Sequence, residues 1–213
     1  MVNLSELARL QAAVYRPAAG EFDALIDNGS VYVGVINQPD RKILAFRGSV
    51  TLTDWLHDFE AIPMTRPLVG TVHTGMWAGV EDIFERLDLR AGDVVSIVGH
   101  SLGCAHGAFT ARLCLLRGIR VEQLYLLAPP RMGYSDFIAG LHNVGDLRAW
   151  HNAIDPVPEV PIATDDMPWA QFDLIKFVET PGGVDDLIPT KYHAIGLYVK
   201  GIADEHFGHQ GGD

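Results

Sequence analysis

Residues 93–105 read Asp-Val-Val-Ser-Ile-Val-Gly-His-Ser-Leu-Gly-Cys-Ala. The apolar positions before Gly99 predict a strand buried on both faces, and the leucine- and alanine-rich residues 102–116 predict a helix after it. Between them, Gly99, Ser101 and Gly103 form a Gly-x-Ser-x-Gly turn, in which glycines let the strand and the helix approach closely. Such a turn holds a serine hydroxyl out at the end of a sheet, so we predict that Ser101 is a nucleophile.

Strands and helices alternate along the rest of the chain. Apolar residues at helical spacing predict helices at residues 4–14, 79–89, 102–116 and 192–200. Runs rich in β-branched residues predict strands at residues 31–36, 43–46, 94–98, 124–128 and 147–152. The sequence therefore predicts one α/β domain over residues 1–213, with a mostly parallel sheet covered by helices on both faces. Residues 201–213 are expected to form a flexible tail.

The composition is that of a globular protein able to bury a large core. Of the 213 residues, 48% are hydrophobic and 20% are charged. A net charge of −11 argues against nucleic acid or anionic lipid as a partner, because phosphates would be repelled. The same charge is compatible with a neutral ester substrate. Composition does not indicate an oligomeric state.

The two cysteines and the N-terminus predict a reducing environment. Cys104 and Cys114 lie ten residues apart on one predicted helix, so their Cα atoms are about 15 Å apart and cannot form a disulfide with each other. The first residues show no basic segment followed by an apolar one, and no apolar run is long enough to span a membrane. We therefore expect a cytoplasmic protein with no stable membrane insertion.

An activated serine needs a histidine base, and His193 is the best candidate. The histidines after Ser101 are His106, His142, His151, His193, His206 and His209. The side chain of His106 is expected to point away from Ser101, since it lies on the helix that follows. His142 and His151 precede every suitable acid loop, and the last two histidines belong to the polar tail. His193, after a proline-containing loop, is left as the base.

Asp155 is the predicted acid that orients this base. It follows the end of a predicted strand, and Pro156 and Pro158 restrict its loop. A carboxylate held in this way can fix the tautomer of an imidazole and stabilise the imidazolium. The other acids downstream occur in adjacent pairs, which is typical of solvated loops. They are Asp165, Asp166, Asp185 and Asp186.

Five segments in order carry a family resemblance. They are Ala45-Phe-Arg-Gly-Ser with Thr53-Asp-Trp-Leu, Val72-His-Thr-Gly-Met, Gly99-His-Ser-Leu-Gly, Ala128-Pro-Pro-Arg-Met-Gly and Asn152-Ala-Ile-Asp-Pro-Val-Pro. With these segments the chain resembles the class 3 lipase family, the fungal-type lipase domain of the α/β-hydrolase superfamily, from about residue 31 to residue 198. The resemblance implies an α/β-hydrolase fold and a reaction that needs no cofactor or metal.

The resemblance also implies a role for each site residue. Ser101 would be the nucleophile, Asp155 the acid and His193 the base. Ser49 would contribute its backbone N–H, and its hydroxyl as a further donor, to an oxyanion hole beside the backbone N–H of Leu102. Gly48 agrees with this role, since a glycine at a strand end lets consecutive amides turn toward one point.

Candidates for substrate binding are aromatic. Trp55 and Trp169 would either line the acyl site or pack in the core, and His100 lies next to the nucleophile. His206 and His209 are interpreted as part of a solvated tail, so no metal site is predicted.

These residues predict a serine carboxylic ester hydrolase, a lipase or esterase acting on a small-molecule ester or an acylglycerol. Two alternatives stay open: an acyltransferase that uses the same triad, and a catalytically silent binding protein with this fold. The length of the acyl chain is not predicted.

Overall fold

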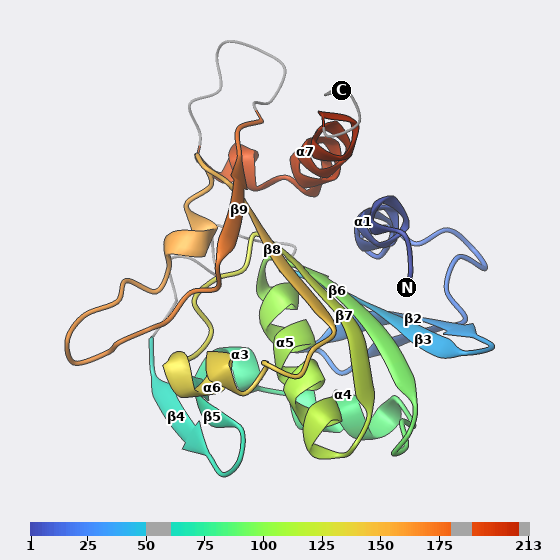
Figure 1. Cartoon of the computed structure of the whole chain (residues 1–213), viewed down its shortest axis with the longest axis horizontal. Coiled ribbons are helices and arrows are strands. Elements are labelled where there is room, and N and C mark those ends of the chain that lie inside the picture. The colour runs from blue at the N-terminus through green and yellow to red at the C-terminus, as the bar shows by residue number, and fades with distance from the viewer. Residues whose placement is uncertain (50–60, 180–188, 209–213) are drawn as a thin grey trace.

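A seven-stranded sheet forms the centre of the computed structural model, which describes residues 1–49, 61–179 and 189–208 (Figure 1). Its strands, in spatial order, are β1 (Ala24–Asp27), β2 (Tyr32–Gln38), β3 (Arg41–Arg47), β6 (Val94–His100), β7 (Arg120–Leu127), β8 (Asp146–Asn152) and β9 (Leu174–Phe177). The pairs β1–β2 and β2–β3 are antiparallel, and every pair from β3 to β9 is parallel. This confirms the predicted, mostly parallel sheet. A separate hairpin pairs β4 (Pro63–Arg66) with β5 (Gly70–His73).

Helices cover both faces of the sheet, as Figure 1 shows. One face carries α3 (Thr74–Trp77), α4 (Val80–Arg86), α5 (Leu102–Leu116) and α6 (Ser135–Ala139), and the other carries α1 (Leu4–Ala13) and α7 (Ile195–Gly208). Alternate residues of each strand enter one of two cores. Phe46 and Ile97 face α5, whereas Ala45 and Val98 face α1 and α7. Because both faces of such a strand are buried, its sequence is a continuous apolar run.

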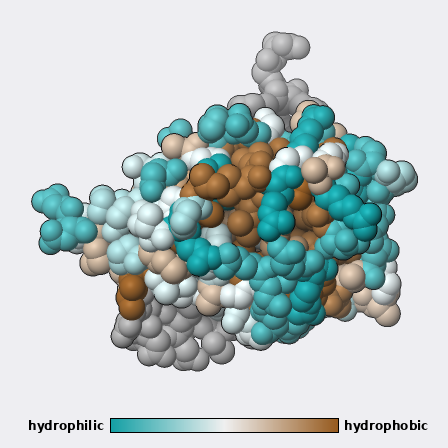
Figure 2. All heavy atoms as spheres, turned by 90° about the horizontal axis from the view of Figure 1, so that it is seen from below, coloured by the Kyte–Doolittle hydropathy of each residue, from teal (hydrophilic) through white to brown (hydrophobic). Residues whose placement is uncertain are grey.

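Figure 2 shows the molecule from below, on the side where α4 and α5 lie. Apolar atoms gather near the middle of this face and polar side chains surround them. Leu113 and Leu115 of α5 and Ile138 of α6 are partly buried and pack against the larger core on this side. These helices thus cover the face of the sheet opposite to α1 and α7.

Close packing holds the corner between β6 and α5. A Cβ atom on Gly103 would lie 2.1 Å from the carbonyl oxygen of Phe46 on β3, and one on Gly99 would lie 2.4 Å from the carbonyl oxygen of Gly103. Neither position therefore accepts a side chain, which is the constraint that the Gly-x-Ser-x-Gly pattern predicted.

The C-terminal helix differs from the prediction. Instead of ending near residue 200, α7 continues to Gly208, so residues expected to begin a flexible tail are helical. Tyr198 is fully buried and Ile202 is 1% exposed, and both belong to the core shared with α1. Burial of this apolar face stabilises the helix beyond the glycine at position 201. The four-residue strands β1, β4, β5 and β9 were not predicted either, because such short segments carry little periodicity.

Replacing Gly103 with Ala should destabilise the protein by about 1–3 kcal/mol, since the methyl group must push β3 and α5 apart. Gly196→Ala is the matched control, because a Cβ there would meet no atom within 4 Å. We expect this control to be neutral or slightly stabilising, as it replaces a glycine within a helix. Denaturant unfolding of both variants tests this, and equal losses of stability would contradict it.

Candidate active site

Ser101 occupies the corner between β6 and α5, with a φ of 59° and a ψ of −132°. Its amide donates a hydrogen bond to the carbonyl of Leu127 at 3.0 Å, which ties the corner to β7. The residue is 2% exposed, and its hydroxyl has no hydrogen-bond partner among the described residues. Strained backbone and an unused buried hydroxyl are both typical of a group kept available for chemistry.

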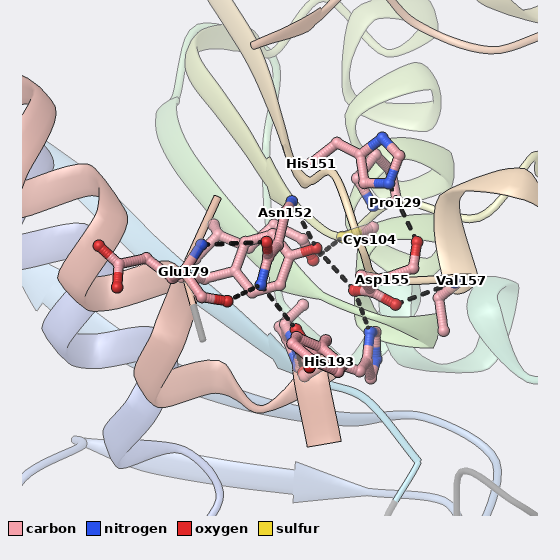
Figure 3. A network of polar contacts seen from close by, with 12 residues as sticks. Cys104, Pro129, His151, Asn152, Asp155, Val157, Glu179 and His193 are labelled. Atoms are coloured by element: carbon pink, nitrogen blue, oxygen red, sulfur yellow. Dashed lines mark hydrogen bonds and ion pairs between the residues drawn. The ribbon is translucent and has the colours of Figure 1, made fainter. Parts of the chain in front are cut away.

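Asp155 follows the carboxyl end of β8, and three donors surround its carboxylate (Figure 3). The amide of Val157, at the start of the short helix η1 (Val157–Glu159), donates to Oδ1 at 2.9 Å. His193 Nδ1 and the Tyr198 hydroxyl each donate to Oδ2 at 2.6 Å. The carboxylate is 2% exposed, so these bonds replace its hydration and fix its orientation.

His193 ends the short helix η2 (Pro189–His193) and faces Asp155 directly (Figure 3). Because Nδ1 donates to the carboxylate, the neutral ring carries its lone pair on Nε2. Nε2 is buried and has no partner in the described part of the chain. No hydrogen bond joins Nε2 to the hydroxyl of Ser101 among these residues; such bonds commonly tighten only when substrate binds.

His100 connects His193 with the segment that precedes Ser49. Its ring stacks on that of His193, with centroids 4.6 Å apart, and its Nε2 donates to the His193 carbonyl at 3.0 Å. Nδ1 therefore accepts from the hydroxyl of Tyr15 at 2.7 Å, and that hydroxyl accepts from the amide of Gly48 at 3.1 Å. Burial, with a contribution from His193, lowers the pKa of His100 well below its usual value and keeps the ring neutral.

This placement of His100 differs from the predicted substrate contact. The side chain is 3% exposed and both ring nitrogens already have partners, so it holds His193 and Gly48 in position instead.

Of the two tryptophans predicted to bind substrate, Trp55 lies outside the described residues. Trp169 is 4% exposed and packs between Tyr134 and His73, with ring centroids 5.0 Å and 5.4 Å away. This position favours the core-packing alternative for Trp169 over a wall of an open acyl site.

Ser49 and Leu102 lie together in the wall of one cavity of about 250 Å³. Neither amide donates a backbone hydrogen bond to a described residue. A Cβ atom on Gly48 would lie 2.7 Å from the Cβ of Ser101, so the chain before Ser49 passes directly against the elbow. The two residues predicted to form an oxyanion hole therefore line the same space, and neither amide donates to a described backbone carbonyl.

The described residues contain no metal cluster, and neither cysteine is suited to act as a nucleophile. Across residues 1–49, 61–179 and 189–208, no cluster of His, Cys, Asp or Glu could hold a metal ion, and no helix is long and apolar enough to cross a membrane. Both cysteines are buried and free. Burial raises the pKa of the Cys104 thiol well above its usual value and that of Cys114 to about 12, so neither is a ready nucleophile.

The sequence analysis missed two tyrosines. Tyr198 lies five residues after His193, in the same apolar segment. This spacing was a usable signal, because a helix that starts after His193 brings Tyr198 close to Asp155. Tyr15 follows α1, far from every motif, and nothing in the sequence marks it as a partner of His100.

The parallel sheet, the strained serine between β6 and α5, and helices on both faces define an α/β-hydrolase fold, as predicted. Solved structures with this fold include a triacylglycerol lipase from Penicillium expansum (20% identity, 82% of this chain and 78% of that chain covered, TM-score 0.61). Rhizomucor miehei triacylglyceride lipase is another (22% identity, 74% and 72% covered, TM-score 0.57). The family model "Lipase (class 3)" matches residues 43–164, and the chain belongs to this family.

The matched region covers about half the length of each curated relative. The secreted mono- and diacylglycerol lipase A of Penicillium cyclopium is 25% identical over 150 residues, covering 66% of this chain and 49% of the relative. Phospholipase A1-II 7 of Oryza sativa subsp. indica is 25% identical over 221 residues, covering 76% and 51%. The chain spans about half the length of these relatives.

The predicted cytoplasmic location is contradicted by the relatives. The matching lipases of Penicillium cyclopium and Penicillium camembertii are both secreted, which points to the extracellular space. The prediction had relied on the first residues of the chain and on unpaired cysteines, and neither feature reports where a member of this family acts.

Removing the Tyr198 hydroxyl should weaken both the fold and the site. Tyr198→Phe leaves Asp155 with one donor fewer on Oδ2, and we expect a loss of about 1–2 kcal/mol in stability and a roughly tenfold lower turnover of a p-nitrophenyl ester. Tyr125→Phe is the matched control: its hydroxyl donates to Asp146 at 2.6 Å, near the opposite ends of the strands. The control should lose similar stability and keep its turnover; equal losses of turnover would contradict a positioning role.

His106 should make stability depend on pH. Burial lowers its pKa to about 3, whereas an unfolded histidine titrates near 6.5. Between these values the unfolded chain binds more protons, so stability falls as pH falls, by up to about 1.4 kcal/mol per pH unit. His106→Gln should reduce that slope in unfolding measured from pH 7 to pH 4. The exposed His142 provides the control, and His142→Gln should follow the unsubstituted protein.

Proposed function

We propose that the protein is a serine carboxylic ester hydrolase that acts through an acyl-enzyme, with Ser101 as nucleophile, His193 as base and Asp155 as orienting acid. One observation supports this most strongly. The lone-pair nitrogen of His193 and the hydroxyl of Ser101 are both buried without partners among the described residues, while the other nitrogen of His193 is bound to a fully engaged carboxylate. A base with a free lone pair, oriented by a carboxylate, together with an unpaired serine hydroxyl suits acyl transfer.

The reaction follows from these positions. Ser101 Oγ attacks the ester carbonyl carbon while His193 Nε2 takes its proton, and Asp155 stabilises the imidazolium that forms. The carbonyl oxygen becomes an oxyanion and accepts hydrogen bonds from the amides of Ser49 and Leu102. His193 then protonates the leaving alcohol. Finally it deprotonates a water molecule, which attacks the acyl carbon; as the bond to Ser101 Oγ breaks, His193 returns this proton to Oγ and the carboxylic acid is released.

The substrate class is an ester of a small molecule or an acylglycerol. Membership of the class 3 lipase family supports it, as does the mono- and diacylglycerol lipase among the relatives. The secreted relatives also support an extracellular site of action.

Substitutions in the triad test this function. Ser101→Ala and His193→Ala should each leave only the residual rate that binding and the oxyanion hole supply, and Asp155→Asn should lower kcat by up to about 10⁴ with little change in KM. Rates on p-nitrophenyl esters of increasing chain length, with and without an emulsion, measure these effects and define the acyl preference.

Matched variants control for general damage. Asp165→Asn and His142→Ala change an exposed acid and an exposed histidine, and both should keep full activity. A serine-reactive phosphonate should label the unsubstituted protein on Ser101 and fail on Ser101→Ala. If the unsubstituted protein takes no label and hydrolyses no ester, it is a silent member of the fold.

A further inference from the structure

The cavity that holds Ser49 and Leu102 in its wall extends beyond the oxyanion amides. Its wall also contains Arg47 from the end of β3, Tyr32 from the start of β2 and His106 from α5. Neither Ser101 nor His193 lines it. The space is about 250 Å³, enough for a small polar group beside Ser49 and Leu102.

Arg47 has no counter-charge among the residues that the structure describes. Its guanidinium lies 3.9 Å from the centre of the Tyr32 ring, and its Nε is buried without a hydrogen-bond partner. No carboxylate in the described part of the chain forms an ion pair with it, although Arg41 and Arg131 each pair with a glutamate. The chain holds 27 acidic residues against 16 Lys and Arg, so a shortage of carboxylates is not the reason.

His106 adds a second unused polar group to the same wall. The residue is 2% exposed, and its Nδ1 has no partner among the described residues. A buried imidazole nitrogen without a partner costs stability unless a ligand satisfies it. Because burial keeps this ring neutral, it can offer one N–H to a bound group and adds no charge.

We propose that this cavity binds an anionic group, a carboxylate or a phosphate, carried by the ester substrate, with Arg47 supplying the charge and His106 and the Ser49 hydroxyl supplying further donors. The proposal rests on the proposed ester hydrolysis and adds a substrate class to it. A planar guanidinium stacked on a ring is already oriented, so it loses little freedom when it binds an oxyanion.

Asp27 is the one acid among the described residues of the wall, and it limits where the anion can lie. One of its carboxylate oxygens accepts from the amide of Gly29 at 2.8 Å, and it forms no ion pair with Arg47 among the described residues. The anion therefore lies at the Arg47 end of the cavity, beside Ser49.

Two parts of a substrate could carry the anion, and two matched substrate pairs distinguish them. The p-nitrophenyl monoester of glutarate and p-nitrophenyl valerate differ by a carboxylate on the acyl chain. The 3-phosphate of 1-octanoylglycerol and 1-octanoylglycerol itself differ by a phosphate on the alcohol. For each pair the ratio of kcat/KM, anionic over neutral, is measured at low ionic strength. Because both values of kcat/KM are proportional to the concentration of folded enzyme, their ratio does not depend on how much of a variant is folded.

Arg47→Gln should lower one of the two ratios about tenfold, the loss expected for one charge-assisted hydrogen bond. Arg47→Lys should give an intermediate value, because the charge remains but the planar pair of N–H donors is lost. Arg90→Gln is the charge-matched control: Arg90 is 79% exposed and pairs with Asp88, and its loss should leave both ratios unchanged. The ratio that falls identifies the acyl chain or the alcohol as the source, and no fall in either overturns the proposal.

A second measurement does not need catalysis. Inorganic phosphate, compared with chloride at equal ionic strength, should raise the unfolding midpoint of the unsubstituted protein and of Arg90→Gln, but not that of Arg47→Gln. If no ester is hydrolysed, the proposed function fails and this comparison still decides the anion site. An equal rise in all three proteins would place phosphate elsewhere and overturn the site.

Discussion

The contact between the Gly103 backbone and the Phe46 carbonyl sets the geometry on which the site depends. It brings α5 so close to β3 that no side chain fits between them. Because β3 ends at Arg47, this approach places Gly48 and Ser49 beside the elbow serine. Ser49 and Leu102, which are far apart in the sequence, therefore line one cavity.

The second core stabilises the other half of the site. Tyr15 follows α1 and Tyr198 lies on α7, and the two helices share one face of the sheet. One hydroxyl bonds His100 and the other bonds Asp155. Packing of α1 against α7 is therefore coupled to the orientation of the imidazole and of its carboxylate. Burial raises the pKa of both tyrosines, so both stay protonated donors.

Local patterns predicted the parts of the fold that depend on short-range sequence. The continuous apolar run before Gly99 and the glycine spacing around Ser101 predicted the central strand, the turn and the nucleophile candidate. Proline around Asp155 and elimination among histidines predicted two residues that the structure brings within hydrogen-bond distance. The extension of α7, the role of Tyr15 and the burial of Trp169 depend on long-range packing, and no local pattern reports such contacts. The partners of His100 were not predicted for the same reason, since they are Tyr15, which follows α1, and His193 of η2.

Net charge is a poor guide to the surroundings of Ser49. An overall charge of −11 is compatible with a neutral ester, yet Arg47 lines the same cavity as Ser49 and forms no ion pair with a described carboxylate. Charges separated by more than a Debye length, about 10 Å, are largely screened at the surface, so distant acids contribute little there. A group bound in a half-enclosed cavity responds to the few charges that line it. Among the described residues these charges are one arginine, held flat on Tyr32, and one aspartate already bonded to a backbone amide. The proposed preference for an anionic ester depends on the balance between those two charges more than on the composition of the chain.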